Sequence, residues 1–276
     1  MTTNGSGAST YTDIEVEVAD PVAIIRLNRP ERLNALTYPM LASIRLAVDD
    51  AAADPSVVGI IVTGNGRGFS SGLDSEVLKA TTEAGSSGRA RPAEGELAGM
   101  FSYFLHAPKP IIAAVNGVAA GGGFVLAAMA DLRIASPAAS FTTIFSKRGL
   151  TSEHGTSWIL PKLVGPGRAL DLLWSSRRID GAEALQMGLV EYLCSDGEDP
   201  VERARAYIAD LAENISPTSI ADMKRLVYRH LDTMYPEALA EADVATWQAL
   251  DRPDSREGAM ALIEKRGSNF PRLGVA

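Results

Sequence analysis

The residues best suited to chemistry in this 276-residue chain form two glycine-rich turns, each after an apolar run. The first turn, GRGFSSGLD at residues 66–74, follows the apolar run at 57–63. The second, NGVAAGGG at residues 116–123, follows the apolar run at 111–115. Glycine lets the backbone approach a ligand closely and adopt conformations closed to other residues. Two such turns can aim free N–H groups at one point, which is what an oxyanion hole requires.

The first turn also has two alternative interpretations. Residues 68–72 match Gly-x-Ser-x-Gly, the nucleophile elbow that α/β-hydrolases place between a strand and a helix. Residues 64–67 already separate the apolar run from this motif, and a triad would need His154 and an acid to meet. Ser70 as a nucleophile therefore stays an alternative. A dinucleotide-binding turn is disfavoured because Phe69 takes the place of its last glycine.

Glu153 and His154 form the other polar pair of interest, beside Gly155 and among apolar residues. A carboxylate here can act as a general base, helped by partial desolvation, or it can simply charge a helix N-terminus. His154 is expected to be structural, and Cys194 to be a buried small apolar residue. The three histidines and one cysteine show no metal-ligand spacing, so no catalytic metal is expected.

Composition indicates an ordinary soluble globular protein, with 46% hydrophobic and 22% charged residues. The net charge of −8 argues against non-specific binding of DNA or RNA. A polar start without an apolar h-region and the single cysteine favour a cytoplasmic location. Residues 111–130 carry no formal charge, but Asn116 and several glycines interrupt them. We expect a strand, a turn and a helix there, and no membrane span.

Strand and helix patterns alternate around the two turns, so an α/β core is expected. A β-hairpin is predicted at 14–27 and an amphipathic helix at 39–53. Further elements are predicted as strands at 57–63, 111–115 and 131–135, and as helices at 122–130 and near 97–106. Residues 79–96, rich in Thr, Gly, Ser and Ala, are predicted to form a mobile loop, as a lid over a site.

The strand signals stop after residue 196, and only helix patterns follow. These helices are predicted at 201–215, 218–234, 236–251 and 255–264, each separated from the next by a proline. The chain is therefore expected to have three parts. They are a disordered tail at 1–12, an α/β core at 13–196 and a helical region at 197–276.

Six motifs in sequence order resemble the crotonase superfamily, the enoyl-CoA hydratase and isomerase family. Besides the first turn, they lie at residues 27–36, 112–117, 131–135, 181–190 and 264–270. The resemblance covers nearly the whole chain after residue 12. It implies a crotonase (ClpP-like) spiral of ββα turns with a C-terminal helical region used in trimerisation. The partners it implies are further copies of the chain, in a homotrimer or a dimer of trimers.

The resemblance also implies a coenzyme A thioester as substrate, with no other cofactor required. The N–H groups of Leu73 and Gly122 would hold the thioester oxygen and stabilise an enolate. Coenzyme A binding is implied for Arg29, Arg32, Leu33, Ala35, Ser71, Gly72, Asp74, Lys265 and Phe270. The basic members of this set, together with Arg266, are candidates for contacts with the phosphates.

Three positions decide which reaction the resemblance implies. Hydratases of this family use two glutamates, whose places are taken here by Val125 and Phe145. Glu153 instead falls on the single acid of the enoyl-CoA isomerases. One carboxylate suffices to move a proton between two carbons, because no water need be activated. Glu153 is therefore predicted to be the base that moves a double bond in an enoyl-CoA.

Other activities stay open at this point. Glu153 could act alone as the acid and base of a hydratase, or the site could hydrolyse a thioester. The chain could also be a non-catalytic binder of acyl-CoA. Four aromatic residues are candidates for an apolar acyl pocket, although such residues are more often plain core: Tyr103, Phe104, Phe145 and Trp158.

Overall fold

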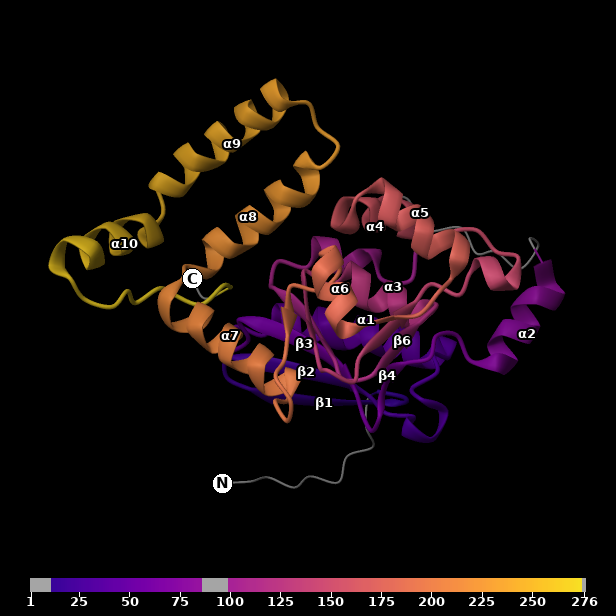
Figure 1. The fold of residues 1–276 in the computed structure, drawn as a ribbon. Helices are drawn as coiled ribbons and strands as arrows, with labels where there is room; N and C mark the ends of the chain where they lie inside the picture. Colours follow the sequence, from indigo (N-terminus) through magenta and orange to yellow (C-terminus); the bar gives the residue numbers. More distant parts are fainter. Residues whose placement is uncertain (1–10, 86–98, 275–276) are drawn as a thin grey trace, which may run out of the picture.

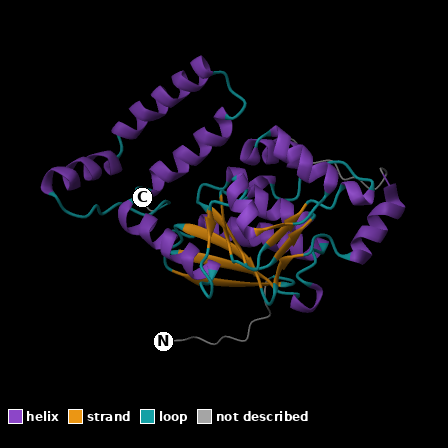
Figure 2. Ribbon diagram, in the orientation of Figure 1, coloured by secondary structure: helices purple, strands orange, loops and turns teal. Residues whose placement is uncertain are grey.

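Two sheets form the centre of the computed structural model, which describes residues 11–85 and 99–274 (Figures 1 and 2). The larger sheet has the strand order β1 (Ile14–Ala19), β2 (Val22–Leu27), β3 (Gly59–Gly64), β5 (Ile111–Val115), β7 (Leu132–Ala135) and β10 (Tyr192–Leu193). The smaller sheet has the order β4 (Gly68–Ser70), β6 (Val118–Ala120), β8 (Ser140–Thr142) and β9 (Ile179–Asp180). Strands β1 and β2 form the predicted antiparallel hairpin, and β2, β3, β5, β7 and β10 run parallel.

From β3 to β8, successive strands alternate between the two sheets, which confirms the predicted spiral of ββα turns. Each pair puts one strand into the larger sheet and the next into the smaller, and helices follow the pairs. These helices are α2 (Ser75–Ala84) after β3 and β4, α3 (Gly122–Met129) after β5 and β6, and α4 (Thr156–Val164) after β7 and β8. The remaining helices before the C-terminal region are α1 (Tyr38–Ala53), α5 (Pro166–Ser175) and α6 (Gly181–Met187).

The apolar runs of β3 and β5 are buried throughout, as expected for parallel strands covered on both faces. Side chains of β3 alternate between two clusters: Ile60 and Val62 face the main core, and Ile61 faces the second. Helix α7 (Pro200–Asn214) closes the second cluster with Val201, Ala204 and Ile208. The helical region after residue 196 therefore contributes one helix to the core.

The other C-terminal helices form an arm that extends away from the sheets (Figure 1). They are α8 (Pro217–His230), α9 (Tyr235–Leu250) and α10 (Pro253–Glu264), close to their predicted bounds. Asp131 anchors α8 to the core, since its carboxylate accepts from Lys224 Nζ at 2.7 Å and from Tyr228 Oη at 2.9 Å. Among the described residues, no helix has the length and apolarity needed to cross a membrane.

Three local predictions differ from the structure. The predicted loop at 79–96 begins inside α2, because the Asp74 carboxylate accepts from Glu76 N–H at 3.0 Å and caps that helix. The helix predicted near 97–106 is a 3₁₀ turn, η3 (Ser102–His106). Tyr11 and Thr12, predicted to be disordered, hydrogen-bond to Asp50 and Ser43 of α1. Residues 1–10 and 86–98, which carry the rest of the predicted tail and loop, lie outside the described residues.

Candidate active site

The two glycine-rich turns lie against each other where β4 and β6 end. These strands pair in parallel, Gly68 opposite Val118. A Cβ on Gly72 would lie 2.6 Å from Ala120 O and 3.2 Å from Gly122 N, and its φ of +93° also favours glycine. A Cβ on Gly122 would lie 3.7 Å from Leu73 N. The close approach that the sequence predicted therefore depends on glycine at 72.

The backbone N–H groups of Leu73 and Gly122, which lie at this contact, have no acceptor in the described parts of the chain. Leu36 pairs with Leu73 in a parallel bridge, in which Leu36 N donates to Gly72 O and Asp74 N donates to Leu36 O. This pairing turns the Leu73 N–H away from Leu36. Gly122 is the first residue of α3, whose first N–H groups have no partner within the helix. Adjacent unpaired donors at a helix N-terminus suit an anionic oxygen.

Ser70 braces the first turn and is not an exposed nucleophile. Its side chain is fully buried, and its Oγ donates to Asn34 O at 2.8 Å and accepts from Gly72 N at 3.3 Å. Asn34 itself, which the sequence analysis did not single out, is buried and donates to Gly68 O and Asn65 O. Its position inside the motif at 27–36 was the available signal. The serine-hydrolase alternative is therefore wrong.

Arg32 and Leu33, predicted to bind coenzyme A, hydrogen-bond through their carbonyl groups to the first glycine-rich turn. Leu33 O accepts from Ser71 N at 2.9 Å, and Arg32 O accepts from Ser71 Oγ at 3.2 Å. The Arg32 side chain is exposed, and its charge helps to lower the pKa of Asp74. Together these contacts join residues 32–36 to the backbone that carries Leu73.

Arg29 is engaged inside the protein. Its Nη1 donates to Asp74 Oδ2 at 2.9 Å and to Ala35 O at 2.7 Å. The side chain of Arg29 is 19% exposed and that of Asp74 is 10% exposed. The structure therefore places Arg29 as a tie between the first motif and the start of α2, and not as a free cation.

Replacing Asp74 by asparagine is expected to lower the free energy of unfolding by about 2 kcal/mol at pH 7, the scale of hydrogen bonds to a charged group. Hydrogen bonds from Glu76 N–H and from Arg29 hold the pKa of Asp74 below its usual value. A lowered pKa in the folded state stabilises above the unfolded pKa of about 3.9, and this stabilisation is lost as the pH falls through the folded value.

Denaturant unfolding at several pH values checks this prediction. The difference between wild type and Asp74→Asn should shrink below about pH 4, where the wild-type carboxylate becomes protonated. Glu83→Gln on the same helix is the control, because its pair with Lys79 is exposed and 3.9 Å long. A difference that is independent of pH, or equal for both variants, would contradict the proposed role of the charge.

Lys265 and Phe270 lie far from the glycine turns within one chain. Lys265 is the exposed residue that ends α10, and Phe270 packs near Gly258 of the same helix. Figure 1 places α10 and α2 on opposite sides of the molecule, with α3 between them in the core. The structure therefore does not bring these two residues into the same site as Leu73 and Gly122.

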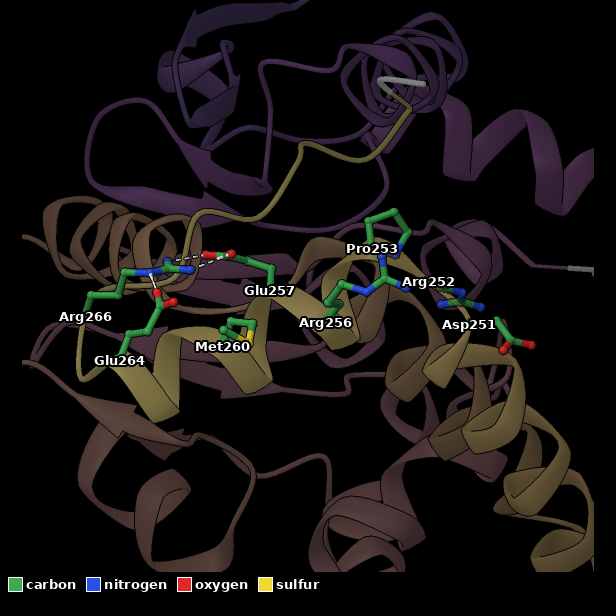
Figure 3. Close-up of a pocket in the computed structure, with 8 residues that line it drawn as sticks. All are labelled: Asp251, Arg252, Pro253, Arg256, Glu257, Met260, Glu264 and Arg266. Carbon is green, nitrogen blue, oxygen red and sulfur yellow. Dashed lines mark hydrogen bonds and ion pairs between the residues drawn. The ribbon is translucent and has the colours of Figure 1, made fainter.

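A pocket of about 420 Å³ opens beside α10 (Figure 3). It is lined by Asp251, Arg252, Pro253, Arg256, Glu257, Met260, Glu264 and Arg266. Arg266, one of the predicted phosphate contacts, already pairs with Glu257 and Glu264 at 2.6 Å each. The pocket thus contains none of the predicted catalytic residues.

Glu153 lies in the segment between η4 (Ser146–Arg148) and α4, and its side chain is half-buried. Its carbonyl oxygen accepts from Thr156 N at 2.9 Å and from Thr156 Oγ1 at 2.6 Å. His154 and Gly155 have φ values of +51° and +81°, so the chain turns sharply after Glu153. A Cβ on Gly155 would lie 3.0 Å from Met129 Cε, so α4 begins against α3. Glu153 is therefore held just before α4, at the point where that helix packs against α3.

Burial lowers the pKa of His154, although the nearby Glu153 carboxylate opposes this. Burial therefore favours the neutral form of His154. Val125 and Phe145 are 0% and 3% exposed and pack in the main core. Neither can transfer a proton. Of the three positions discussed in the sequence analysis, only Glu153 carries a group that can do so.

Comparison with known proteins agrees with this architecture. The model of the family described as enoyl-CoA hydratase/isomerase matches residues 17–272. A putative enoyl-CoA hydratase of Thermus thermophilus is 34% identical over 249 residues, 90% of this chain and 97% of that protein. The probable enoyl-CoA hydratase EchA14 of Mycobacterium tuberculosis is 38% identical over 197 residues, 70% of this chain and 73% of that protein.

A solved structure extends the comparison to the fold. The crystal structure of a putative enoyl-CoA hydratase from Streptomyces coelicolor A3(2) superposes with a TM-score of 0.85 at 30% identity, over 98% of each chain. The fold and the site thus define a protein of the crotonase superfamily. Within it, the chain belongs to the enoyl-CoA hydratase/isomerase family.

Proposed function

We propose that this protein moves a double bond along the acyl chain of an enoyl-CoA. Glu153 removes a proton from the carbon between the thioester and the 3,4 double bond, and the electrons shift to the thioester oxygen. The N–H groups of Leu73 and Gly122 stabilise the resulting enolate. Glu153 then returns the proton to the fourth carbon, which leaves the double bond at the 2,3 position. The step balances without water or an external oxidant.

The observation that carries this proposal is the set of side chains available for proton transfer. Val125 and Phe145 are buried apolar residues, and Glu153 is a half-buried carboxylate just before α4. Moving one proton between two carbons needs one base, which becomes the acid for the second half of the reaction. The two unpaired N–H groups supply the stabilisation of the enolate.

Hydration of a 2-enoyl-CoA is the second candidate, with Glu153 as the sole acid and base. It is favoured by the names of relatives, among them the putative enoyl-CoA hydratase of Thermus thermophilus. The absence of a carboxylate at 125 and 145 argues against it, because activating water and protonating carbon normally engage two groups.

Exchange of the α-protons of 3-enoyl-CoA in heavy water tests whether the chain is a catalyst at all. Wild-type protein should exchange them at a rate that grows with protein concentration, because enolate formation is reversible. The absence of both exchange above the protein-free rate and migration of the double bond would contradict the proposal and would leave a non-catalytic acyl-CoA binder. Mass spectrometry of the recovered thioester gives the deuterium content directly.

We infer that the arm binds further copies of the chain, in a trimer or a dimer of trimers. Exposed large apolar side chains gather on α8, α9 and α10, including Val227 at 61%, Trp247 at 71% and Leu262 at 82% exposed. A neighbouring copy would also supply Lys265 and Phe270 to a coenzyme A that one chain cannot complete. Light scattering should give a multiple of three 29.2-kDa chains, and Trp247→Glu should lower the mass. A monomeric wild type would contradict this inference.

A further inference from the structure

Asp232, in the turn between α8 and α9, joins the arm to α4, the helix that follows Glu153. Its Oδ2 accepts from Trp158 Nε1 at 2.6 Å, and its Oδ1 accepts from Lys162 Nζ at 2.7 Å. Lys162 also donates to Leu231 O at 3.3 Å, and its ammonium lies 4.8 Å from the centre of the Trp158 ring. Trp158 and Lys162 are four residues apart and share one face of the helix. The Asp232 carboxylate is therefore hydrogen-bonded to two side chains of α4.

The first residue of α4 holds the backbone of Glu153. Both the N–H and the hydroxyl of Thr156, the first residue of the helix, donate to Glu153 O. The left-handed conformations of His154 and Gly155 fix the direction in which the chain leaves Glu153. A rotation or shift of α4 would consequently move Glu153 relative to α3.

The helix that precedes Asp232 is anchored to the rest of the protein. Helix α8, which ends next to Asp232, is tied to the core because Lys224 and Tyr228 both bind Asp131. Asp131 in turn accepts from Ile111 N at 2.7 Å, at the start of β5. Glu241 of α9 pairs with α8 through arginines, at 2.9 Å in the case of Arg225. Asp232 thus follows the end of α8, a helix that is fixed by contacts with both the larger sheet and α9.

We propose that Asp232 is a positioning residue for Glu153, acting through Trp158, Lys162 and α4. This inference rests on the proposed role of Glu153 as the base. Exposed ion pairs contribute little to stability, and Asp232 is 61% exposed, so its loss should leave the fold intact. The rate of proton transfer is more sensitive, because a shift of about 1 Å in a reacting group can cost about 10²-fold.

The test compares Asp232→Ala and Asp232→Asn with Glu17→Ala, a control in an exposed pair with Arg205 at 3.3 Å on a surface away from α4. We expect kcat for double-bond migration to fall about tenfold in Asp232→Ala, with KM and the melting temperature nearly unchanged. Asp232→Asn keeps an acceptor for Trp158 and should lose less. Glu17→Ala should match the wild type.

Combining Asp232→Ala with Glu153→Gln shows whether Asp232 acts through Glu153, with the residual rate followed by heavy-water exchange. No further loss in the double variant supports the inference, and an equal further loss overturns it. Unchanged kcat in Asp232→Ala, with Glu153→Gln inactive, overturns the positioning role and leaves the proposed function standing. Full turnover in Glu153→Gln overturns the proposed function, and the inference with it.

Discussion

Replacing Glu153 by glutamine should lower kcat for double-bond migration by about 10²- to 10⁴-fold, the range that positioned acid–base groups supply. Glutamine has nearly the same shape, so it should keep the backbone turn in which Thr156 donates to residue 153. It cannot accept the α-proton of the substrate. The KM for 3-enoyl-CoA should change little, because the N–H groups that hold the thioester oxygen belong to the backbone. Initial rates over a range of substrate concentrations give both constants.

His154→Asn is the matched control for this variant. Asparagine tolerates the left-handed conformation that His154 adopts at φ +51°. A neutral, structural His154 has no part in the proton transfer, so the control should keep most of the wild-type turnover. If Glu153→Gln were as active as the wild type, or if His154→Asn were the inactive variant, another group would be the base.

Removing the N–H of Gly122 should have the second largest effect. Gly122→Pro deletes this donor at the first residue of α3, where proline is well tolerated because its missing N–H has no helical acceptor anyway. Among the described α-helices, prolines occupy the first position of α5, α7, α8 and α10. Loss of one oxyanion donor is expected to lower kcat by about 10²- to 10³-fold.

Gly122→Ala separates the replacement of the N–H from the effect of an added Cβ. Both variants add a Cβ, which would meet the movable end of Leu36 at 3.0 Å, but only proline removes the N–H. The alanine variant should therefore lose much less activity than the proline variant, at comparable melting temperatures. Equal turnover in the two folded variants would contradict the oxyanion role of Gly122.

Much of the fold was predictable because its signals are local. The apolar runs at 57–63 and 111–115, each ended by glycines, correspond to β3 and β5 followed by turns. The four C-terminal helices begin at or next to prolines, which mark helix starts. Helix α2 was missed because its composition resembles a loop, and its start depends on the single carboxylate of Asp74. The N-cap at Asp74 therefore favours a helix in a segment whose composition is typical of a loop.

Contacts between distant residues explain what the sequence could not supply about the site. Arg29 was expected to bind phosphate, but it pairs with Asp74, 45 positions further along the chain. Trp158 was a candidate for an acyl pocket, whereas its indole N–H donates to Asp232 of the arm. The positions of Val125 and Phe145 could be interpreted from the motifs alone, since their chemistry does not depend on a partner.

Product analysis from two separate incubations tests the central claim most directly. Wild-type protein is incubated with 3-enoyl-CoA in the first and with 2-enoyl-CoA in the second. The products are separated by chromatography, and their masses are measured by mass spectrometry. We predict that 3-enoyl-CoA becomes 2-enoyl-CoA, an isomer of equal mass, and that 2-enoyl-CoA gains no water. Rapid conversion of 2-enoyl-CoA to a product heavier by one water, without migration of the double bond in 3-enoyl-CoA, would contradict it.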